Sequence, residues 1–269
     1  MKILFADLDG TLLNNQSKVS EYSIEVLHRM TDAGHKLVLA SGRPLGSILE
    51  VKHLAGLDMP GVYVTANNGS LIYDCDTDVI IFTDPVPMDR VRKIWDTAHE
   101  MDVHIQTYTD DSIVTLKDDK EIRKYTVKIH LPIIYTDDPI GALAHAPAKL
   151  LAIELTDHDK LERFRQKVLG EHNDVLDALY SEPEYLEIYS KTAGKGAALT
   201  WLCNHLGVAI KDSYAAGDAM NDISMIKAAG HGIVMCNADE SVQAHADMVT
   251  EYSNDEDGLA RLIEKEILA

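Results

Sequence analysis

The chain of 269 residues is 46% apolar, which is enough to form a buried core and argues against an intrinsically disordered protein. Its 44 acidic and 25 basic residues give a formal charge of −19, so nucleic acid and anionic membranes, which are also negative, are not expected as partners. Three cysteines without close pairing, and the lack of an apolar stretch of about 20 residues, favour a cytoplasmic protein without a membrane span.

Strands and helices alternate in the first third of the chain. Apolar residues 3–6 predict a strand, and Ser20 is a typical N-cap for the following helix, which ends near Gly34. Residues 36–40 and 62–65 predict two further strands, and both show little polar alternation. This order and composition indicate an α/β fold, in which a Rossmann-like, doubly wound parallel sheet has helices on both faces.

The pattern changes near residue 85 and returns near residue 189. Between these points we predict strands at 103–108, 112–116 and 151–156 and helices at 88–101 and 158–169, whereas the stretch 121–147 has no clear pattern. After them we predict helices at 194–206 and 222–229 and strands at 212–217 and 232–235. The sequence therefore predicts a discontinuous core domain, residues 1–84 and 189–269, and an inserted α+β domain, residues 85–188.

Four polar segments follow or adjoin predicted strands of the core. Asp7 and Asp9 lie in Asp-Leu-Asp-Gly-Thr directly after the first strand, and Ser41 follows the second. Lys195 begins a predicted helix, and Asp218 follows a later strand. Because the carboxyl ends of parallel strands meet at one edge of a sheet, we expect these groups to converge. Carboxylates, an ammonium group and a hydroxyl group together suit a phosphoryl group bound with a hard cation, usually Mg²⁺.

Each segment also has a simpler interpretation. The acidic motif at Asp7 could be a turn or a calcium-binding loop, and Ser41 could cap the next helix. Asp218 could simply stabilise the N-terminus of a nearby helix through its negative charge. Lys195 could be a solvated charge, although a lysine in the first turn opposes the helix dipole. The combination of the four segments is what favours a catalytic site.

The four segments, in this order, resemble motifs I to IV of the haloacid dehalogenase (HAD) superfamily. The most specific match is Asp7-Leu8-Asp9-Gly10-Thr11, and the others are Ser41, Lys195 and Gly217-Asp218-x-x-Asn221-Asp222. The insertion resembles a C2-type cap, and residues 254–260 resemble the Cof-type branch of HAD phosphatases. Cys236 stands where that branch usually has glycine, in a loop outside the four motifs.

The resemblance implies roles for these residues. Asp7 would be the nucleophile that takes the phosphoryl group as an aspartyl phosphate, and Asp9 would be the general acid and then the base. Lys195 would be the third catalytic residue and would offset negative charge. The implied Mg²⁺ ligand residues are Asp7, Asp9 through its backbone carbonyl, Asp218 and, in the outer shell, Asp222. The implied phosphate-binding residues are Leu8, Gly10, Thr11, Ser41, Gly42, Lys195 and Asn221.

The resemblance also implies an activity, the Mg²⁺-dependent hydrolysis of small phosphomonoesters such as sugar phosphates or related phosphometabolites. A closed lid of about a hundred residues argues against protein phosphates as substrates, since these need open access. In the insertion, Tyr108, Lys124, Lys128 and Glu187 could contact the leaving group or be ordinary surface residues. A phosphomutase that returns the phosphoryl group to a sugar and a non-catalytic metabolite-binding module are the alternatives. Neither the natural substrate nor the oligomeric state can be predicted.

Overall fold

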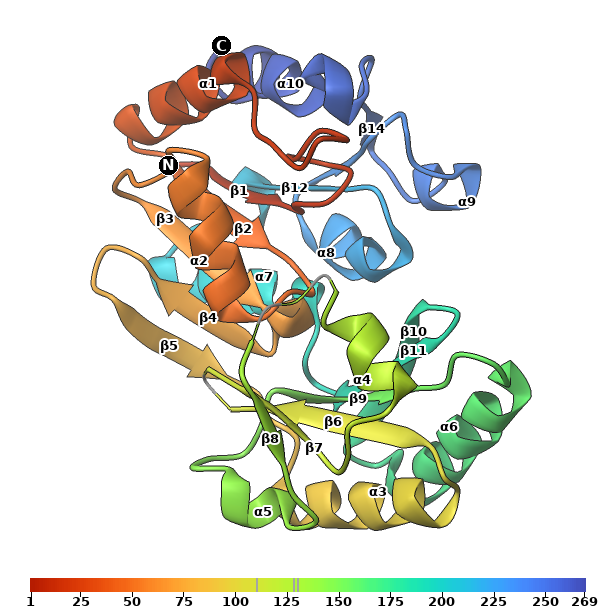
Figure 1. Cartoon of the computed structure of the whole chain (residues 1–269). Coiled ribbons are helices and arrows are strands. Elements are labelled where there is room, and N and C mark those ends of the chain that lie inside the picture. The colour runs from red at the N-terminus through yellow and green to blue at the C-terminus, as the bar shows by residue number, and fades with distance from the viewer. Residues whose placement is uncertain (110, 128, 130) are drawn as a thin grey trace. The chain divides into compact units, whose positions relative to one another are not determined.

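The chain folds into two compact units (Figure 1). The computed structural model describes residues 1–109, 111–127, 129 and 131–269. One unit consists of Met1–Thr83 with Gly194–Ala269, and the other of Asp84–Ala193. Each unit has its own sheet and its own apolar core. Within these described ranges, no helix has both the length and the apolar character that a membrane crossing requires.

The sheet of the first unit is built around β1 (Ile3–Ala6). This strand pairs in parallel with β2 on one side and with β12 on the other. The strands lie in the order β14 (Met248–Val249), β13 (His231–Val234), β12 (Ser213–Gly217), β1, β2 (Lys36–Ala40), β3 (Val62–Ala66), β4 (Leu71–Asp74) and β5 (Val79–Thr83). The pairs from β14 to β3 are parallel, which confirms the predicted α/β fold with a parallel core. The antiparallel strands β4 and β5 are an addition that the sequence analysis did not predict.

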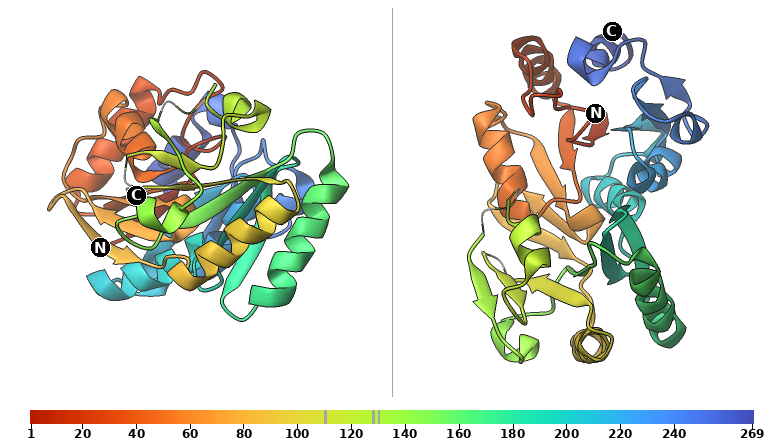
Figure 2. Two further views of the ribbon diagram at one scale, coloured as in Figure 1. Left: turned by 60° about the horizontal axis from the view of Figure 1, so that its bottom comes forward. Right: turned by 45° about the vertical axis from the view of Figure 1, so that its right-hand side comes forward.

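Alternate residues of β1 enter two different apolar cores. Leu4 and Ala6 pack in the core that includes helices α1 (Glu21–Asp32), α2 (Leu45–Leu54) and α10 (Gly258–Glu266). Ile3 and Phe5 pack in the core that includes α7 (Lys195–Leu206) and α8 (Ile223–Ala228). The short helix α9 (Glu240–Gln243) contributes Val242 to a smaller cluster with α8 and β13. Helices α1 and α10 lie side by side (Figures 1 and 2). Both faces of the sheet are therefore covered, which is why its strands lack polar alternation.

Two helices of this unit begin or end at the capping residues that the sequence predicted. The Ser20 side chain accepts a hydrogen bond from the Ser23 N–H and caps α1. Helix α7 ends at Gly207, whose φ of 65° is the left-handed conformation in which glycine costs least. Three short 3₁₀ helices lie in the connections of this unit: η1 (Asn67–Gly69), η2 (Ile210–Asp212) and η3 (Met220–Asp222). A fourth, η4 (Asn254–Glu256), precedes α10.

The second unit is a mostly antiparallel sheet with helices packed against it. Its strands lie in the order β10 (Leu176–Glu182), β11 (Tyr185–Ser190), β9 (Lys149–Ile153), β6 (His104–Tyr108), β7 (Ile113–Thr115) and β8 (Ile133–Tyr135). Its core joins apolar residues of these strands to α3 (Met88–Glu100) and α6 (His158–His172), whereas α4 (Lys120–Tyr125) and α5 (Pro139–Ala142) are short. The helices of this unit are drawn from orange-yellow to green in Figure 1. The unassigned stretch 121–147 contains most of α4 and all of β8 and α5.

One predicted strand of this unit is displaced along the chain. The prediction was 151–156, but β9 begins at Lys149 and ends at Ile153. Its end is set by Glu154, whose carboxylate accepts hydrogen bonds from the N–H and hydroxyl of Thr156 and turns the chain toward α6. Strand β11 is hydrogen-bonded to β9 and runs to Ser190, so the predicted junction at residues 188 and 189 falls inside it. The division into separate domains stays a prediction.

Candidate active site

The site is built around the loop that follows β1. The Asp7 N–H still donates to the Ala216 carbonyl at 2.9 Å, and this bond extends the pairing of β1 with β12. Leu8 is fully buried, and its carbonyl accepts from the backbone N–H groups of the turn that follows. Gly10 has a φ of 79°, and a Cβ placed there would lie 2.4 Å from Asp218 Oδ2. The glycine is therefore needed both for the turn and for the close approach of Asp218.

Asp218, at the end of β12, is brought to the same loop. The Thr11 hydroxyl donates to Asp218 Oδ1 at 2.9 Å. Carboxylate oxygens of Asp7, Asp218 and Asp222 all lie within 4.8 Å of one another. The prediction that the carboxylates of the first and fourth segments meet at one edge of the sheet therefore agrees with the structure.

Lys195, the first residue of α7, lies inside this acidic group. Its side chain is inaccessible to solvent, and its Nζ donates to Asp7 Oδ1 at 2.6 Å and to Asp222 Oδ1 at 2.5 Å. The other oxygen of Asp222 accepts from the backbone N–H groups of Asp218 and Ala219, both at 3.0 Å. Asp222 is fully buried, and both of its oxygens have partners, so it holds the ammonium group and the loop. The simpler interpretation of Lys195 as a solvated charge is wrong.

The carboxylates outnumber the single ammonium group, and their pKa values respond to this imbalance. Burial, assisted by the charges of Asp222 and Asp218 and opposed by Lys195, raises the pKa of Asp7 to about 8. Burial also raises the pKa of Asp218 to about 6, although the Thr11 hydrogen bond acts in the opposite direction. A cation bound to these oxygens would relieve the repulsion, and an all-oxygen donor set suits a hard divalent ion. The residues present therefore fit Mg²⁺.

The Asp9 carboxylate lies outside this group of three carboxylates and is held by Arg43. The arginine donates from Nε and Nη2 to the two carboxylate oxygens of Asp9 at 2.8 and 2.6 Å. The side chain of Asp9 is 57% exposed, and its carboxylate is not part of the acidic group formed by Asp7, Asp218 and Asp222 among the residues described. Arg43 follows Ser41 and Gly42 in the sequence, but no role was predicted for it. No local signal connects the two residues, because Asp9 lies in the turn after β1 and Arg43 follows β2.

Ser41 and Gly42 lie at the end of β2, next to β3. The Ser41 N–H donates to the Thr65 carbonyl at 2.9 Å, and its hydroxyl accepts from the Arg43 N–H at 3.2 Å. Pro44 is the N-cap residue of α2, so the alternative in which Ser41 caps that helix is wrong. The remaining predicted site residue, Asn221, donates from Nδ2 to Asn68 Oδ1 at 3.0 Å.

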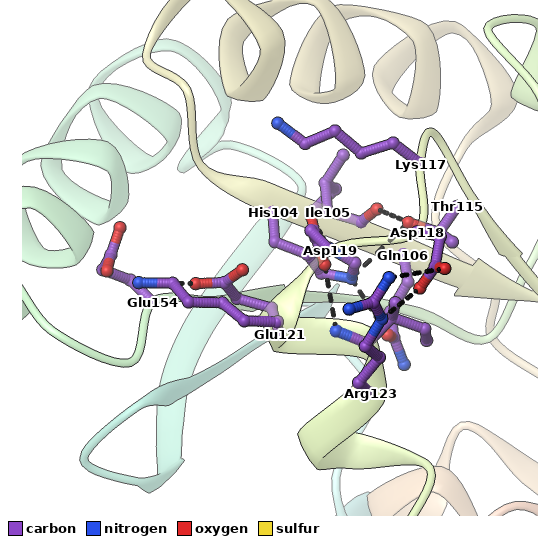
Figure 3. A network of polar contacts seen from close by, with 12 residues as sticks. His104, Ile105, Gln106, Thr115, Lys117, Asp118, Asp119, Glu121, Arg123 and Glu154 are labelled. Atoms are coloured by element: carbon purple, nitrogen blue, oxygen red, sulfur yellow. Dashed lines mark hydrogen bonds and ion pairs between the residues drawn. The ribbon is translucent and has the colours of Figure 1, made fainter.

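Further buried polar side chains lie in the second unit (Figure 3). His104 Nδ1 lies 2.9 Å from Asp119 Oδ2, and His104 Nε2 lies 3.2 Å from Gln106 Oε1. Gln106 donates to the Tyr108 hydroxyl at 2.8 Å, and Tyr108 donates to the Tyr125 hydroxyl at 2.8 Å. Burial raises the pKa of Tyr108 well above its ordinary value. Only Tyr108 of this network was predicted as a candidate, although His104 and Gln106 alternate with it on β6; Asp119 and Tyr125 come from other parts of the chain.

The other polar residues suggested for the insertion have different surroundings. Glu187 is buried and accepts a hydrogen bond from Lys149 Nζ at 3.0 Å, so it is not an ordinary surface residue. Lys124 is half exposed and forms an ion pair with Glu184 at 2.5 Å. Lys128 lies outside the described residues.

The fold and the acidic site define a class of protein. A family model for haloacid dehalogenase-like hydrolases matches residues 4–263. The chain belongs to this family, and the predicted membership of the HAD phosphatases, Cof-type, is confirmed.

Relatives and solved structures agree with this family over the full chain. A Bacillus subtilis protein named 5-amino-6-(5-phospho-D-ribitylamino)uracil phosphatase is 32% identical, over 98% of this chain and 98% of its own. The pyridoxal phosphate phosphatase YbhA of Escherichia coli is 30% identical, over 97% of each chain. The crystal structure of a haloacid dehalogenase-like hydrolase from Bacteroides thetaiotaomicron superposes with a TM-score of 0.88, at 31% identity over 98% of each chain. The chain is a phosphatase of this family, and the non-catalytic alternative is set aside.

Proposed function

We propose that the protein hydrolyses small phosphomonoesters with Mg²⁺, through an aspartyl phosphate on Asp7. The observation that carries the proposal is the contact of Lys195 Nζ with both Asp7 and Asp222, next to Asp218. A buried ammonium group beside a buried carboxylate offsets charge where a phosphate dianion must approach. Phosphoryl transfer depends mainly on such positioning and charge neutralisation.

In the first step, a carboxylate oxygen of Asp7 forms a bond to phosphorus as the bond from phosphorus to the ester oxygen breaks. Asp9 donates a proton to the departing oxygen, so the alcohol leaves neutral. In the second step, water attacks the phosphorus and gives its proton to Asp9, and the bond between phosphorus and Asp7 breaks. Inorganic phosphate and the free Asp7 carboxylate result. The two hydrogen bonds from Arg43 give the Asp9 carboxylate a defined position before substrate enters, and one of them must be released when Asp9 carries the proton.

Mg²⁺ would be held by the carboxylates of Asp7 and Asp218 and by the backbone carbonyl of Asp9. Asp222 would lie in the outer shell of the ion and would hold Lys195 and the loop in place. When bound, it would reduce the repulsion between Asp7 and the phosphate. The phosphate oxygens would be bound by Lys195 and by the side chains of Ser41 and Asn221. Backbone N–H groups of the turn at Leu8, Gly10 and Thr11, and of Gly42, would complete this binding site.

For the substrate we propose a small phosphorylated metabolite, such as a sugar phosphate or a phosphorylated cofactor or its precursor. The support is the names of two relatives, one a phosphatase of a phosphoribitylamino-uracil and one a phosphatase of pyridoxal phosphate. Neither nucleic acid nor a membrane is proposed as a partner, because the chain carries a formal charge of −19. A cytoplasmic location is part of the same proposal.

The test is phosphate release from a panel of small phosphate esters, with Mg²⁺ and with EDTA, by wild type and by Asp7→Asn. We expect release that requires Mg²⁺ and that falls at least ~10³-fold in Asp7→Asn, because the amide cannot form the acyl phosphate. Near-native turnover in Asp7→Asn would rule out the mechanism. Dependence on a bisphosphate activator, with little free phosphate, would identify a phosphomutase instead.

A further inference from the structure

The turn Asn67–Gly69, which connects β3 with β4, has an unusual backbone. Its three residues have consecutive φ values of 50°, 56° and 94°. Side chains other than those of Asn, Asp and Gly rarely adopt this left-handed region, and a run of three such residues is costly unless the surroundings hold it. None of the four sequence motifs includes this turn, but its hydrogen bonds connect it with the site.

The backbone of the turn is bonded to the loop that carries Ser41. The Asn67 N–H donates to the Arg43 carbonyl, and the Asn68 N–H donates to the Ser41 carbonyl, both at 3.0 Å. The turn also contacts the start of α7, since a Cβ at Gly69 would lie 2.4 Å from the Gly194 carbonyl oxygen. The left-handed turn therefore fits closely against two of the four motif segments.

The side chain of Asn68 reaches a third segment. Its Oδ1 accepts a hydrogen bond from Asn221 Nδ2 at 3.0 Å. Asn221 immediately precedes Asp222, which in turn binds the Lys195 ammonium group at 2.5 Å. The exposed amide of Asn221 is thus fixed by a residue from a different strand end, and an exposed side chain that is fixed in this way loses less entropy when it binds an anion.

We infer that Asn68 is a positioning residue for phosphoryl transfer and acts by orienting the Asn221 amide toward the phosphate. The inference rests on the proposed function, in which Asn221 binds the phosphate oxygens. Asn68 itself is not required to touch the reacting atoms. The left-handed backbone is what places its Oδ1 against Asn221 while its N–H group is bonded to Ser41.

The decisive variant is Asn68→Gly, because glycine adopts a φ of 56° without strain and removes only the side chain. We expect kcat/KM for phosphate release to fall about 10-fold, since small displacements of a positioning group cost rates of this order. Inhibition by orthovanadate, which resembles the pentacoordinate transition state, should weaken by a similar factor. The matched control is Ser17→Gly, an exposed position with a φ of 57°, which should leave kcat/KM within about 2-fold of wild type.

A double-mutant cycle separates positioning from general damage to the fold. In Asn221→Ala, adding Asn68→Gly should cause a further loss of less than about 2-fold, because the side chain through which Asn68 acts is already gone. A 10-fold loss in both backgrounds, or no loss in either, would overturn the inference. High activity of Asp7→Asn would instead overturn the proposed function, so the two failures can be told apart.

Discussion

Lys195 Nζ lies 2.6 Å from Asp7 Oδ1, and its side chain is inaccessible to solvent, whereas that of Asp7 keeps an exposure of 10%. The same ammonium group also binds Asp222, which is fully buried. The proposed nucleophile is therefore held by a cation that belongs to the protein, independently of any ion or substrate. This arrangement has consequences for stability as well as for catalysis.

Replacing Lys195 should reduce both the stability of the protein and its rate of phosphate release. Lys195→Met removes the charge and leaves two buried carboxylates without it, which typically costs about 3–5 kcal/mol of unfolding free energy. Phosphate release should fall at least ~10²-fold. Chemical denaturation and steady-state kinetics measure the two effects. Lys52→Met is the matched control, since the partner of Lys52 is the half-exposed Asp58, and it should cost less than about 1 kcal/mol. Equal losses in both variants would contradict the importance assigned to the buried pairs.

The stability of the metal-free protein should fall as the pH rises from about 4 to about 8. Asp7 and Asp218 have pKa values raised to about 8 and about 6, above the ordinary value of 3.8. The folded state therefore binds protons more tightly than the unfolded chain, and this contribution is lost as the pH passes the folded-state values. Thermal unfolding in EDTA across this range measures the effect.

Two comparisons identify the groups responsible for this pH dependence. Asp7→Asn and Asp218→Asn should each flatten the curve, because each removes one titrating carboxylate. Saturating Mg²⁺ should restore stability most strongly near pH 8, where the ligand carboxylates are free of protons. A curve that rises with pH in EDTA would show that these two carboxylates do not dominate.

Gly10→Ala should weaken Mg²⁺ activation. The new Cβ would overlap Asp218 Oδ2 at 2.4 Å and displace a proposed ligand. Gly34→Ala is a close control, since Gly34 has a φ of 84° but a Cβ there would meet nothing within 4 Å. Both variants should lose about 1 kcal/mol of stability from backbone strain, and only Gly10→Ala should need more Mg²⁺ for half-maximal phosphate release. Equal Mg²⁺ requirements would argue against Asp218 as a ligand.

Asp9→Asn should affect substrates according to their leaving groups. A sugar phosphate releases a poorly acidic alcohol and needs a proton from Asp9, so its first step should slow by about 10²–10⁴-fold. p-Nitrophenyl phosphate releases a stable phenolate, and its first step should slow much less. Burst kinetics with both esters measure the first step apart from the attack of water. Equal effects on the two esters would argue against Asp9 as the general acid.

The sequence predicted those features that depend on local pattern or on strand order. The apolar residues of β1 and β2 and the capping residue Ser20 are local signals, and they placed these elements correctly. The meeting of Asp7 with Asp218 follows from parallel strands that end at one edge.

The features that escaped prediction depend on partners that are distant in the chain. Arg43 pairs with Asp9, and Asn68 pairs with Asn221, in each case through side chains that no spacing rule connects. Strand β8 has only three residues and is defined by its pairing with β7, so no window of sequence could reveal it. The sequence shows that Asn68 and Arg43 are polar, but only the folded structure shows which side chains they bind.

The position of β1 in the middle of its sheet also affects how the protein is made. Ile3 lies opposite Ser213 in β12, so β1 must wait for one of its two neighbours until synthesis has passed Ser213. During that interval one hydrogen-bonding edge of an entirely apolar strand is open to other chains. Nascent molecules should therefore depend on chaperones until translation reaches β12, and early termination before this strand should give aggregation rather than a smaller folded protein.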